Sequence, residues 1–333
     1  MGVPRPESFP TPASVGSQPT WTQPNTPQLG GQYSGRMLIT GASGFVGSNL
    51  ARAFRAHNLV GVVGFSKVPS TDDVDAATTR ARADLRDGAE VSRLIHELNP
   101  EVVIHVAGNK NVKHCEQDPD AAIAINRTAT AHVARACQDI SAKLVYLSTD
   151  LVFDGEVGGY SETSVPRPGT VYGRTKLAGE DEALTICDRA VVCRTGGVYG
   201  LGSPLFAWLE QELSAGKSVE AFQDVVSTPT YVGDLAVFIN RVLVNDVSGT
   251  LHTVGSEAVS RYEWFSQFAT AFGYDRHLIM PAVAGPRRRE LLLPRDVSLK
   301  GHQTEARLGY RAAPPRAGLD LLRRASHTKA RTS

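Results

Sequence analysis

Short apolar runs alternate with helical patterns along most of this chain. The apolar, β-branched runs lie at residues 36–40, 59–65, 101–108, 143–149 and 190–200. Apolar residues repeat with helical spacing over residues 45–54, over 87–99 and in a long stretch that begins near residue 119. Strands that are apolar throughout are typical of a parallel sheet covered on both faces. The pattern therefore predicts an α/β fold, a Rossmann-type doubly wound parallel sheet.

The regular alternation weakens after about residue 200. A helix is predicted over residues 260–273, opened by a capping box of Ser260 and Glu263 and closed by Gly273. Residues 249–255 read as a short strand. We expect a cofactor domain over residues 35–200 and a smaller mixed lobe over 201–325, with some return to the sheet. Ligands of open α/β sheets bind at the carboxyl ends of the strands, where this lobe should carry the substrate contacts.

The first 34 residues differ in composition from the rest. They hold seven of the 19 prolines together with many Ser, Thr and Gln residues. Such a segment buries too little apolar surface to offset its ordering entropy, so we predict a disordered tail. A segment that docks a partner is the alternative.

Bulk composition excludes several classes of function. With 41% hydrophobic and 21% charged residues, the chain has ordinary globular composition, and its net charge of +1 argues against nucleic-acid or membrane partners. The four cysteines have no paired or metal-ligand spacing, which favours a reduced, cytoplasmic protein. His105 and His114 lack a third ligand at metal spacing, so no metal site is expected.

A glycine-rich turn follows the first predicted strand. Gly41, Gly44 and Gly47 recur every third residue between a strand and a helix. Gly41 would permit a tight turn, Gly44 a close approach of backbone N–H groups to a pyrophosphate, and Gly47 close helix packing. A plain strand–turn–helix junction is the alternative, but we expect a dinucleotide site. The same loop supplies Ser43, Phe45 and Val46 as further cofactor contacts.

The end of the second strand bears on which dinucleotide binds. An NAD-selective site needs a carboxylate there for the ribose hydroxyls, whereas this chain has Phe65, Ser66 and Lys67. A hydroxyl followed by a cation suits a 2′-phosphate, so Ser66 and Lys67 favour NADP as the cofactor. A solvated Lys67 in a site that also accepts NAD is the alternative.

Three side chains suggest carbonyl chemistry. The strand over residues 143–149 delivers Thr149 to the expected nicotinamide edge, and Tyr172 and Lys176 follow one helical turn apart. A nearby ammonium, together with the positive ring of the oxidised cofactor, should lower the pKa of the tyrosine, which could then donate a proton to an alkoxide while Thr149 holds the carbonyl oxygen. The alternative is a retained but unused set.

These motifs resemble the extended branch of the short-chain dehydrogenase/reductase superfamily. The wider glycine spacing, "ADLRD", "HVAGN" and Asn126 fall where that branch has cofactor motifs. The resemblance implies that the cofactor also contacts Asp84, Leu85, Ala107, Gly108, Tyr172 and Lys176, with Asp84 at the adenine ring.

Within that branch, the chain resembles dTDP-4-dehydrorhamnose reductase and its relatives from about Arg36 to Leu322. The motifs that carry this likeness are "STDLVFDG", "VYGRTKLAGE", "CRTGGVYG", "STPTYVGDLA" and "LPRDVSLKGHQTEARLGY". The resemblance implies NADPH-dependent reduction of the 4-keto group of a nucleotide-activated deoxysugar. The implied catalytic residues are Thr149, Tyr172 and Lys176, and the implied substrate contacts are Asp150, Arg194 and Arg289. A solvated basic turn is the alternative for Arg289.

The chain also departs from related patterns. Dehydratases of the branch have a second carboxylate where Leu151 stands, so dehydration is not expected. The rhamnose-forming reductases usually have aromatic residues at the Leu151 and Gly197 positions, and their absence predicts a differently shaped sugar. A 4-epimerase with bound NAD and a non-catalytic unit like the beta regulatory subunit of methionine adenosyltransferase are the alternatives, and a homodimer is left open.

Overall fold

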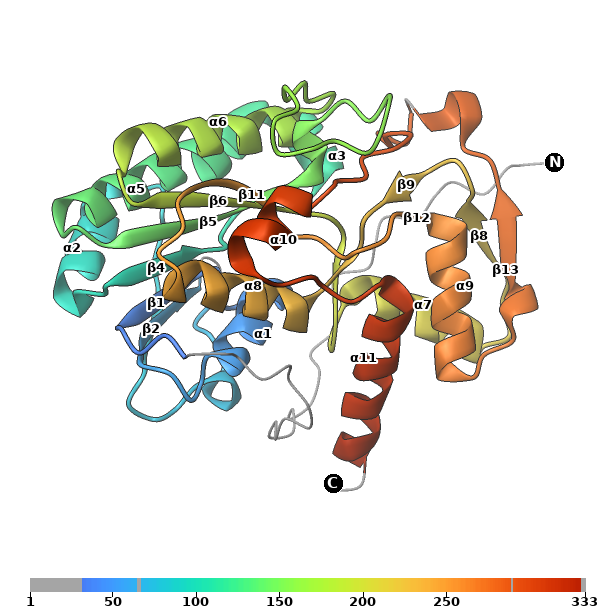
Figure 1. The fold of residues 1–333 in the computed structure, drawn as a ribbon, viewed down its shortest axis with the longest axis horizontal. Coiled ribbons are helices and arrows are strands. Elements are labelled where there is room, and N and C mark those ends of the chain that lie inside the picture. The colour runs from blue at the N-terminus through green and yellow to red at the C-terminus, as the bar shows by residue number, and fades with distance from the viewer. Residues whose placement is uncertain (1–31, 65–66, 289, 331–333) are drawn as a thin grey trace.

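A computed structural model describes residues 32–64, 67–288 and 290–330 of the chain. A large lobe built on a central sheet stands beside a smaller lobe that contains α9, β8 and β13 (Figure 1). Within these described ranges, no helix combines the length and the apolar character needed to cross a membrane.

The central sheet has seven strands, and every pairing in it is parallel. Its spatial order is β11 (Gly249–His252), β6 (Ala190–Thr195), β5 (Lys143–Thr149), β4 (Val102–His105), β1 (Met37–Thr40), β2 (Leu59–Gly64) and β3 (Thr79–Arg82). The strand order reverses between β1 and β4, which creates the crevice where such sheets bind ligands. The predicted Rossmann-type fold is confirmed.

Helices cover both faces of the sheet (Figure 1). One face carries α1 (Phe45–Ala53) and α8 (Val232–Val244), and the other carries α2 (Gly88–Leu98), α5 (Ala129–Asp139) and α6 (Val171–Ile186). Side chains of β1 alternate between the two cores: Met37 and Ile39 pack on the first face and Leu38 on the second. All three are fully buried, so neither face of β1 is exposed to solvent at these positions.

The connection from β4 to β5 contains several short helices. They are α3 (Val112–Gln117), α4 (Pro119–Ile123), a π-helical turn over Ala124–Thr128, and α5. The predicted start at Pro119 is confirmed, with the Asp118 side chain accepting a hydrogen bond from Ala121 N–H. The π turn interrupts the single long helix that was expected, and it holds the buried Asn126.

The smaller lobe combines helices with three two-stranded pairings. Its helices are α7 (Pro204–Ser214), α9 (Arg261–Phe272) and α11 (Pro315–Ala330). Its pairings are β7 (Val198–Tyr199) with β10 (Thr230–Tyr231), β9 (Val226–Ser227) with β12 (Val259–Ser260), and β8 (Val219–Phe222) with β13 (Ile279–Ala282). The predicted capping box of Ser260 and Glu263 opens α9, and Gly273 caps it with φ of 79°.

Two elements differ from the pattern-based prediction. β3 was not predicted, because its sequence Thr-Arg-Ala-Arg lacks an apolar run and mostly faces solvent at the sheet edge. The single strand predicted over residues 190–200 is two strands, because the chain leaves β6 after Thr195 and passes through Gly196 and Gly197 into β7 of the smaller lobe.

The C-terminal half contributes to both lobes. α8 lies against the central sheet, β11 forms an edge strand of that sheet, and α10 (His302–Leu308) packs on both. Most of the predicted tail, residues 1–31, lies outside the described residues. Tyr33 was counted with that tail, yet it packs against the core beside α8 and its N–H donates to Asn240 Oδ1 at 3.2 Å. The folded body therefore begins before residue 35.

Candidate active site

The glycine turn after β1 has the geometry of a phosphate cradle. Gly41 has φ of 71°, and a Cβ there would lie 2.5 Å from Ala107 N. A Cβ on Gly47 would overlap the Gly41 carbonyl, so helix α1 can approach the turn only with glycine there. Gly44 is the exposed N-cap of α1 and has no side chain to occupy the first N–H groups. These free donors and the helix dipole suit a dinucleotide pyrophosphate.

The residues predicted to select NADP are only partly described. Ser66 lies outside the described residues, while Lys67 is exposed beyond the end of β2. A Cβ on Gly64 would lie 2.8 Å from Ser43 Oγ and would overlap the Lys67 carbonyl. The turn that carries Lys67 therefore packs closely on the phosphate cradle.

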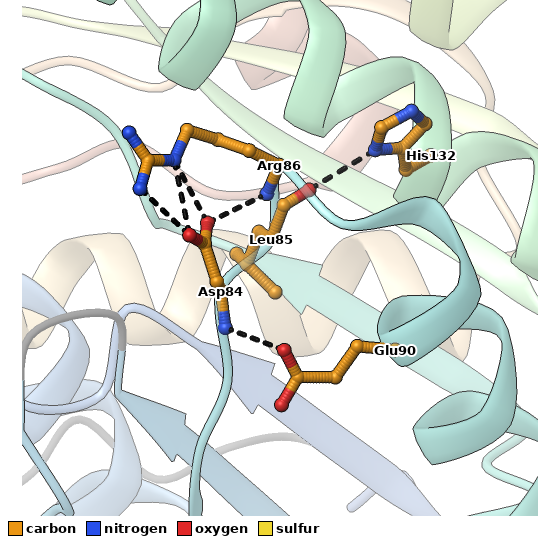
Figure 2. A network of polar contacts seen from close by, with 5 residues as sticks. All are labelled: Asp84, Leu85, Arg86, Glu90 and His132. Atoms are coloured by element: carbon orange, nitrogen blue, oxygen red, sulfur yellow. Dashed lines mark hydrogen bonds and ion pairs between the residues drawn. The ribbon is translucent and has the colours of Figure 1, made fainter.

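The segment expected at the adenine ring forms a polar network (Figure 2). The Asp84 carboxylate accepts hydrogen bonds from the Arg86 backbone N–H at 3.0 Å and from its guanidinium at 2.7–3.2 Å. These bonds hold the pKa of Asp84 below its usual value. Asp84 N–H donates to Glu90 Oε2, and the Leu85 carbonyl accepts from His132 Nδ1. The network fixes this loop and leaves Leu85 buried.

Asn126 joins the loop after β4 to helix α6. Its Oδ1 accepts from Asn109 N–H at 2.7 Å, and its Nδ2 donates to the Asn109 carbonyl and to Thr175 Oγ1. Gly108, just before Asn109, is exposed, and a Cβ there would lie 3.0 Å from Asn126 Oδ1. The buried Asn126 amide thus fixes the position of the loop of Ala107 and Gly108, which is predicted to contact the cofactor.

Thr149, Tyr172 and Lys176 come from two adjacent elements. Thr149 ends β5, and the other two lie in the first turns of α6, whose N-cap Thr170 accepts from Gly173 N–H. The partly buried Tyr172 phenol lies beside the Thr149 hydroxyl, which donates a hydrogen bond to Asp150 Oδ1 at 3.0 Å. Lys176 Nζ donates to the Leu147 carbonyl at 2.7 Å and lies 4.0 Å from the centre of the Tyr146 ring. The three predicted residues therefore cluster at the carboxyl edge of the sheet.

Burial dominates the electrostatics of this cluster. It raises the pKa of Tyr172 well above its ordinary value, and the Asp150 carboxylate and Cys115 act in the same direction. The protein's own groups therefore do not lower the pKa of Tyr172, and Lys176 bonds the Leu147 carbonyl; the lowering expected from the sequence would depend on the positive ring of the oxidised cofactor. Burial also lowers the pKa of Lys176 to about 7. A phenol with a raised pKa remains protonated at neutral pH and can serve as a proton donor.

The three predicted substrate contacts have different surroundings. Asp150 is buried, accepts a hydrogen bond from Thr149 Oγ1 at 3.0 Å, and has a pKa that burial raises to about 7. Arg194 instead lies inside the fold, bonded through Nε and Nη2 to Glu180 at 2.7–3.1 Å. This ion pair, hidden in sequence because its partners are 14 residues apart, corrects the assignment of Arg194 to the substrate side. Arg289 lies outside the described residues.

A cavity of about 800 Å³ is lined by Leu151, two residues after Thr149, and by Thr170, the N-cap of α6, whereas Thr149, Tyr172 and Lys176 are not among its lining residues. Its walls come from two segments far apart in sequence: Leu151, Phe153, Asp154, Glu156, Gly169 and Thr170 in one, and Gly285, Arg288, Leu292, Leu293, Pro294 and Arg295 in the other. Arg295 was not predicted as a site residue, although it stands in the quoted "LPRD" motif. Only the fold brings Arg288 and Arg295 to the same cavity as Leu151 and Thr170.

Trp264 occupies the space beside Gly197. The Cη2 atom of its indole would lie 3.4 Å from a Cβ at position 197. Trp264 is buried among aromatic residues of the smaller lobe, including Tyr199 and Phe206. A large side chain at position 197 would therefore have to displace this indole.

The fold and the clustered residues together define an NAD(P)-dependent oxidoreductase with a Rossmann-type sheet. The chain belongs to the family described as the RmlD substrate binding domain, whose model matches residues 35–325. This match confirms the resemblance inferred from the sequence motifs.

Three relatives illustrate the range of this family. The probable low-salt glycan biosynthesis reductase Agl14 of Haloferax volcanii is 33% identical over 283 residues, 82% of this chain and 92% of that protein. The dTDP-4-dehydrorhamnose reductase of Mycobacterium tuberculosis is 35% identical over 69% of this chain and 73% of its own length. Methionine adenosyltransferase 2 subunit beta of Rattus norvegicus is 31% identical over 76% of this chain and 77% of its own length.

A solved structure shares the fold. The dTDP-4-dehydrorhamnose reductase of Bacillus anthracis, in complex with NADP, superposes with a TM-score of 0.74 at 24% identity. The superposition covers 87% of this chain and 99% of that chain.

Proposed function

We propose that this protein catalyses NADPH-dependent reduction of the 4-keto group of a nucleotide-activated deoxysugar, with dTDP as the expected nucleotide. The observation that carries the proposal is the cluster of Thr149, Tyr172 and Lys176 beside the cavity of about 800 Å³. The cluster supports carbonyl reduction, and the cavity is large enough for a substrate with a bulky remote group.

In the proposed mechanism each side chain has one task. Thr149 orients the keto oxygen by hydrogen bond, and Tyr172 gives its proton to the oxygen as negative charge develops there. Lys176 provides a cation one turn from the phenol. NADPH, held by the glycine cradle, supplies the hydride when bound. The buried setting of the cluster strengthens these polar interactions because little water competes for them.

The preference for NADPH over NADH rests on the turn after β2. Lys67 is exposed and lies close to the phosphate cradle, where a cation would attract a 2′-phosphate. Binding of NAD is the alternative, with lower affinity than NADP.

The substrate class is supported by the cavity walls. Arg288 and Arg295 line the side contributed by residues 285–295, and guanidinium groups bind phosphate oxygens well. Leu151 contributes an aliphatic surface near Thr149, while Trp264 packs over Gly197. The rhamnose-forming reductases usually have aromatic residues at the positions of Leu151 and Gly197. Their absence here favours a sugar that differs from dehydrorhamnose in shape.

A regulatory role is the second candidate, because a methionine adenosyltransferase beta subunit is 31% identical to this chain. In that case the fold would bind cofactor and a partner enzyme without turnover. The 4-epimerase alternative would require NAD that stays bound through purification, which is directly measurable.

The test follows NADPH absorbance with a panel of dTDP-, UDP- and GDP-linked 4-keto-6-deoxysugars beside the matching free sugars. We expect turnover of a nucleotide form and lower kcat with free sugars, because the remote nucleotide supplies binding energy that orients the keto carbon. Equal rates with free ketones would overturn the substrate class. No turnover across the panel, with NADPH bound, would favour the regulatory role.

A further inference from the structure

Glu180 lies buried where helix α6 packs on strands β5 and β6. Its side chain is 3% exposed, and it accepts hydrogen bonds from Ser148 Oγ at 2.5 Å and from the Arg194 guanidinium at 2.7–3.1 Å. The bidentate geometry and the serine bond satisfy much of the carboxylate. This network was not predicted from sequence, although Glu180 ends the "VYGRTKLAGE" motif.

Lys176 precedes Glu180 by one turn of the same helix. Its side chain is also buried, with Nζ bonded to the Leu147 carbonyl and stacked over the Tyr146 ring. A buried ammonium is poorly solvated and tends to lose its proton. Burial lowers the pKa of Lys176 to about 7, and the Glu180 carboxylate opposes this change.

We propose that Glu180 is a positioning residue for the reaction: it favours the charged form of Lys176, which lies one turn earlier on α6, and through Ser148 it holds the end of β5 that presents Thr149. The inference rests on the proposed function, in which Lys176 acts as a cation beside Tyr172. Glu180 itself touches neither Tyr172 nor the cavity walls in the described contacts, so its influence passes through Lys176 and Ser148.

Other titratable groups surround Lys176 and share its environment. Tyr146 on β5 and His105 on β4 lie close to it, and Tyr172 precedes it by one turn of α6. Asp150 in the turn after β5 and Cys115 on α3 act on Tyr172, and Arg194 on β6 pairs with Glu180. His105 is neutral at physiological pH, because burial and the nearby Lys176 lower its pKa to about 3. Among these groups, Glu180 is the anion that raises the pKa of Lys176.

The experiment compares the full-length protein with Glu180→Gln across pH. Residues four apart on a helix are neighbours, and a neighbouring opposite charge moves a pKa by about one unit or more, so we expect the alkaline limb of kcat/KM to move about one pH unit lower. With a pKa near 7 in the wild type, this means a loss of about tenfold at pH 8 and about twofold at pH 6. The Kd for NADPH, measured by fluorescence, should weaken more at pH 8 than at pH 6.

Two matched variants separate charge from structure. Glu182→Gln removes a carboxylate from the same helix. That carboxylate pairs with Arg127 on the surface, so its loss should leave the pH profiles of kcat/KM and of NADPH affinity unchanged. The double variant Glu180→Gln with Arg194→Gln replaces the buried ion pair by two neutral amides. If Glu180 acts by its charge, the alkaline limb of kcat/KM in the double variant lies at the same lower pH as in Glu180→Gln. A limb at the wild-type pH would overturn the proposal.

An unmoved alkaline limb in folded Glu180→Gln, checked by its thermal melt, would also overturn it. If that variant does not fold, the double variant carries the test, and Glu180→Asp should retain the wild-type limb because it retains the charge. The NADPH measurement needs no sugar substrate. A pH-dependent loss of NADPH affinity would therefore support the inference even if no nucleotide sugar is reduced.

Discussion

Single side chains in this site have protonation properties that follow from burial. The Tyr172 phenol packs against Cys115, Ala122 and Val171, and the neighbouring Asp150 carboxylate further disfavours its ionised form. A phenol in this state enters the reaction with its proton in place. The same environment makes Asp150 and Lys176 sensitive to pH near neutrality, since burial brings the pKa of each to about 7.

Replacing Tyr172 by Phe should lower kcat by about two to four orders of magnitude, the usual contribution of a positioned general acid. Folding and NADPH affinity should change little, because only the hydroxyl is removed. Steady-state kinetics, fluorescence titration and a thermal melt check these three expectations. Tyr274→Phe is the control, since the Tyr274 hydroxyl bonds Ser214 and Glu210 in the smaller lobe. A Tyr172→Phe rate above a tenth of wild type would remove the phenol from the proton-transfer step.

Asp150 should make stability depend on pH with a sign opposite to that of most carboxylates. Its pKa is about 7 in the folded protein and 3.8 for an exposed aspartate, so folding takes up a proton between these two pH values. The free energy of unfolding from this group is therefore highest below about pH 4 and falls as pH rises to about 7.

Asp150→Asn should remove that slope, with a gain over wild type at pH 8 of at most about 4 kcal/mol. Urea unfolding at several pH values measures it, and Asp181→Asn, an exposed carboxyl on α6, should follow the wild type. Parallel curves for wild type and Asp150→Asn would show that Asp150 is not held protonated by the fold.

Among the secondary-structure elements, the β1–α1 junction is the most tightly constrained. The first turn of α1 crosses the Gly41 carbonyl so closely that only glycine fits at position 47. The close approach points the N–H groups of the helix at the place where a pyrophosphate would lie. Local sequence is sufficient to build this element, because the turn and the helix are contiguous.

Gly47→Ala should therefore destabilise the protein and weaken NADPH binding together. The added Cβ meets backbone atoms of Gly41 and Ala42, which cannot rotate away as a flexible side chain would. We expect a loss of about 1–3 kcal/mol, the usual cost of overpacking, measured by urea unfolding. Ser48→Ala, in the same turn of α1, adds no atoms and should retain cofactor affinity. Wild-type stability and affinity in Gly47→Ala would refute the close approach.

For the molecule as a whole, two features depend on contacts between distant parts of the chain. The candidate cavity is lined by the turn after β5 and by residues within 285–288 and 292–295. Tyr33, near the start of the described chain, packs against the core beside α8. Each lobe contributes to the cavity, so substrate binding is expected to bring both lobes into contact with one ligand. A homodimer stays a prediction.

Two N-terminal truncations test where the folded body begins. Removing residues 1–31 should leave the melting temperature unchanged, because that segment has the composition of a disordered tail. Removing residues 1–34 should lower the melting temperature by a few degrees. The partly buried Tyr33 side chain and the hydrogen bond from the Tyr33 backbone N–H to Asn240 together add about 1–2 kcal/mol to the free energy of unfolding. Equal melting temperatures for both truncations would show that Tyr33 adds nothing to the fold.

Several features could be predicted from the sequence because their causes are local. The capping box of α9 and the glycine cradle each depend on residues within a few positions of one another. The apolar strands and the spacing of Thr149, Tyr172 and Lys176 are also readable, since a helix turn brings positions four apart onto one face. The edge strand β3 was missed because it has no apolar run.

What the sequence by itself determined is therefore the class of fold, the cofactor cradle and the identity of the clustered Thr, Tyr and Lys residues. Only the tertiary structure decided the direction of their pKa values, because desolvation depends on how completely neighbouring elements cover each group. It also decided that Arg194 faces Glu180, since pairing across β6 and α6 depends on how the helix docks on the sheet. Long-range packing, which no local pattern encodes, places these charges together.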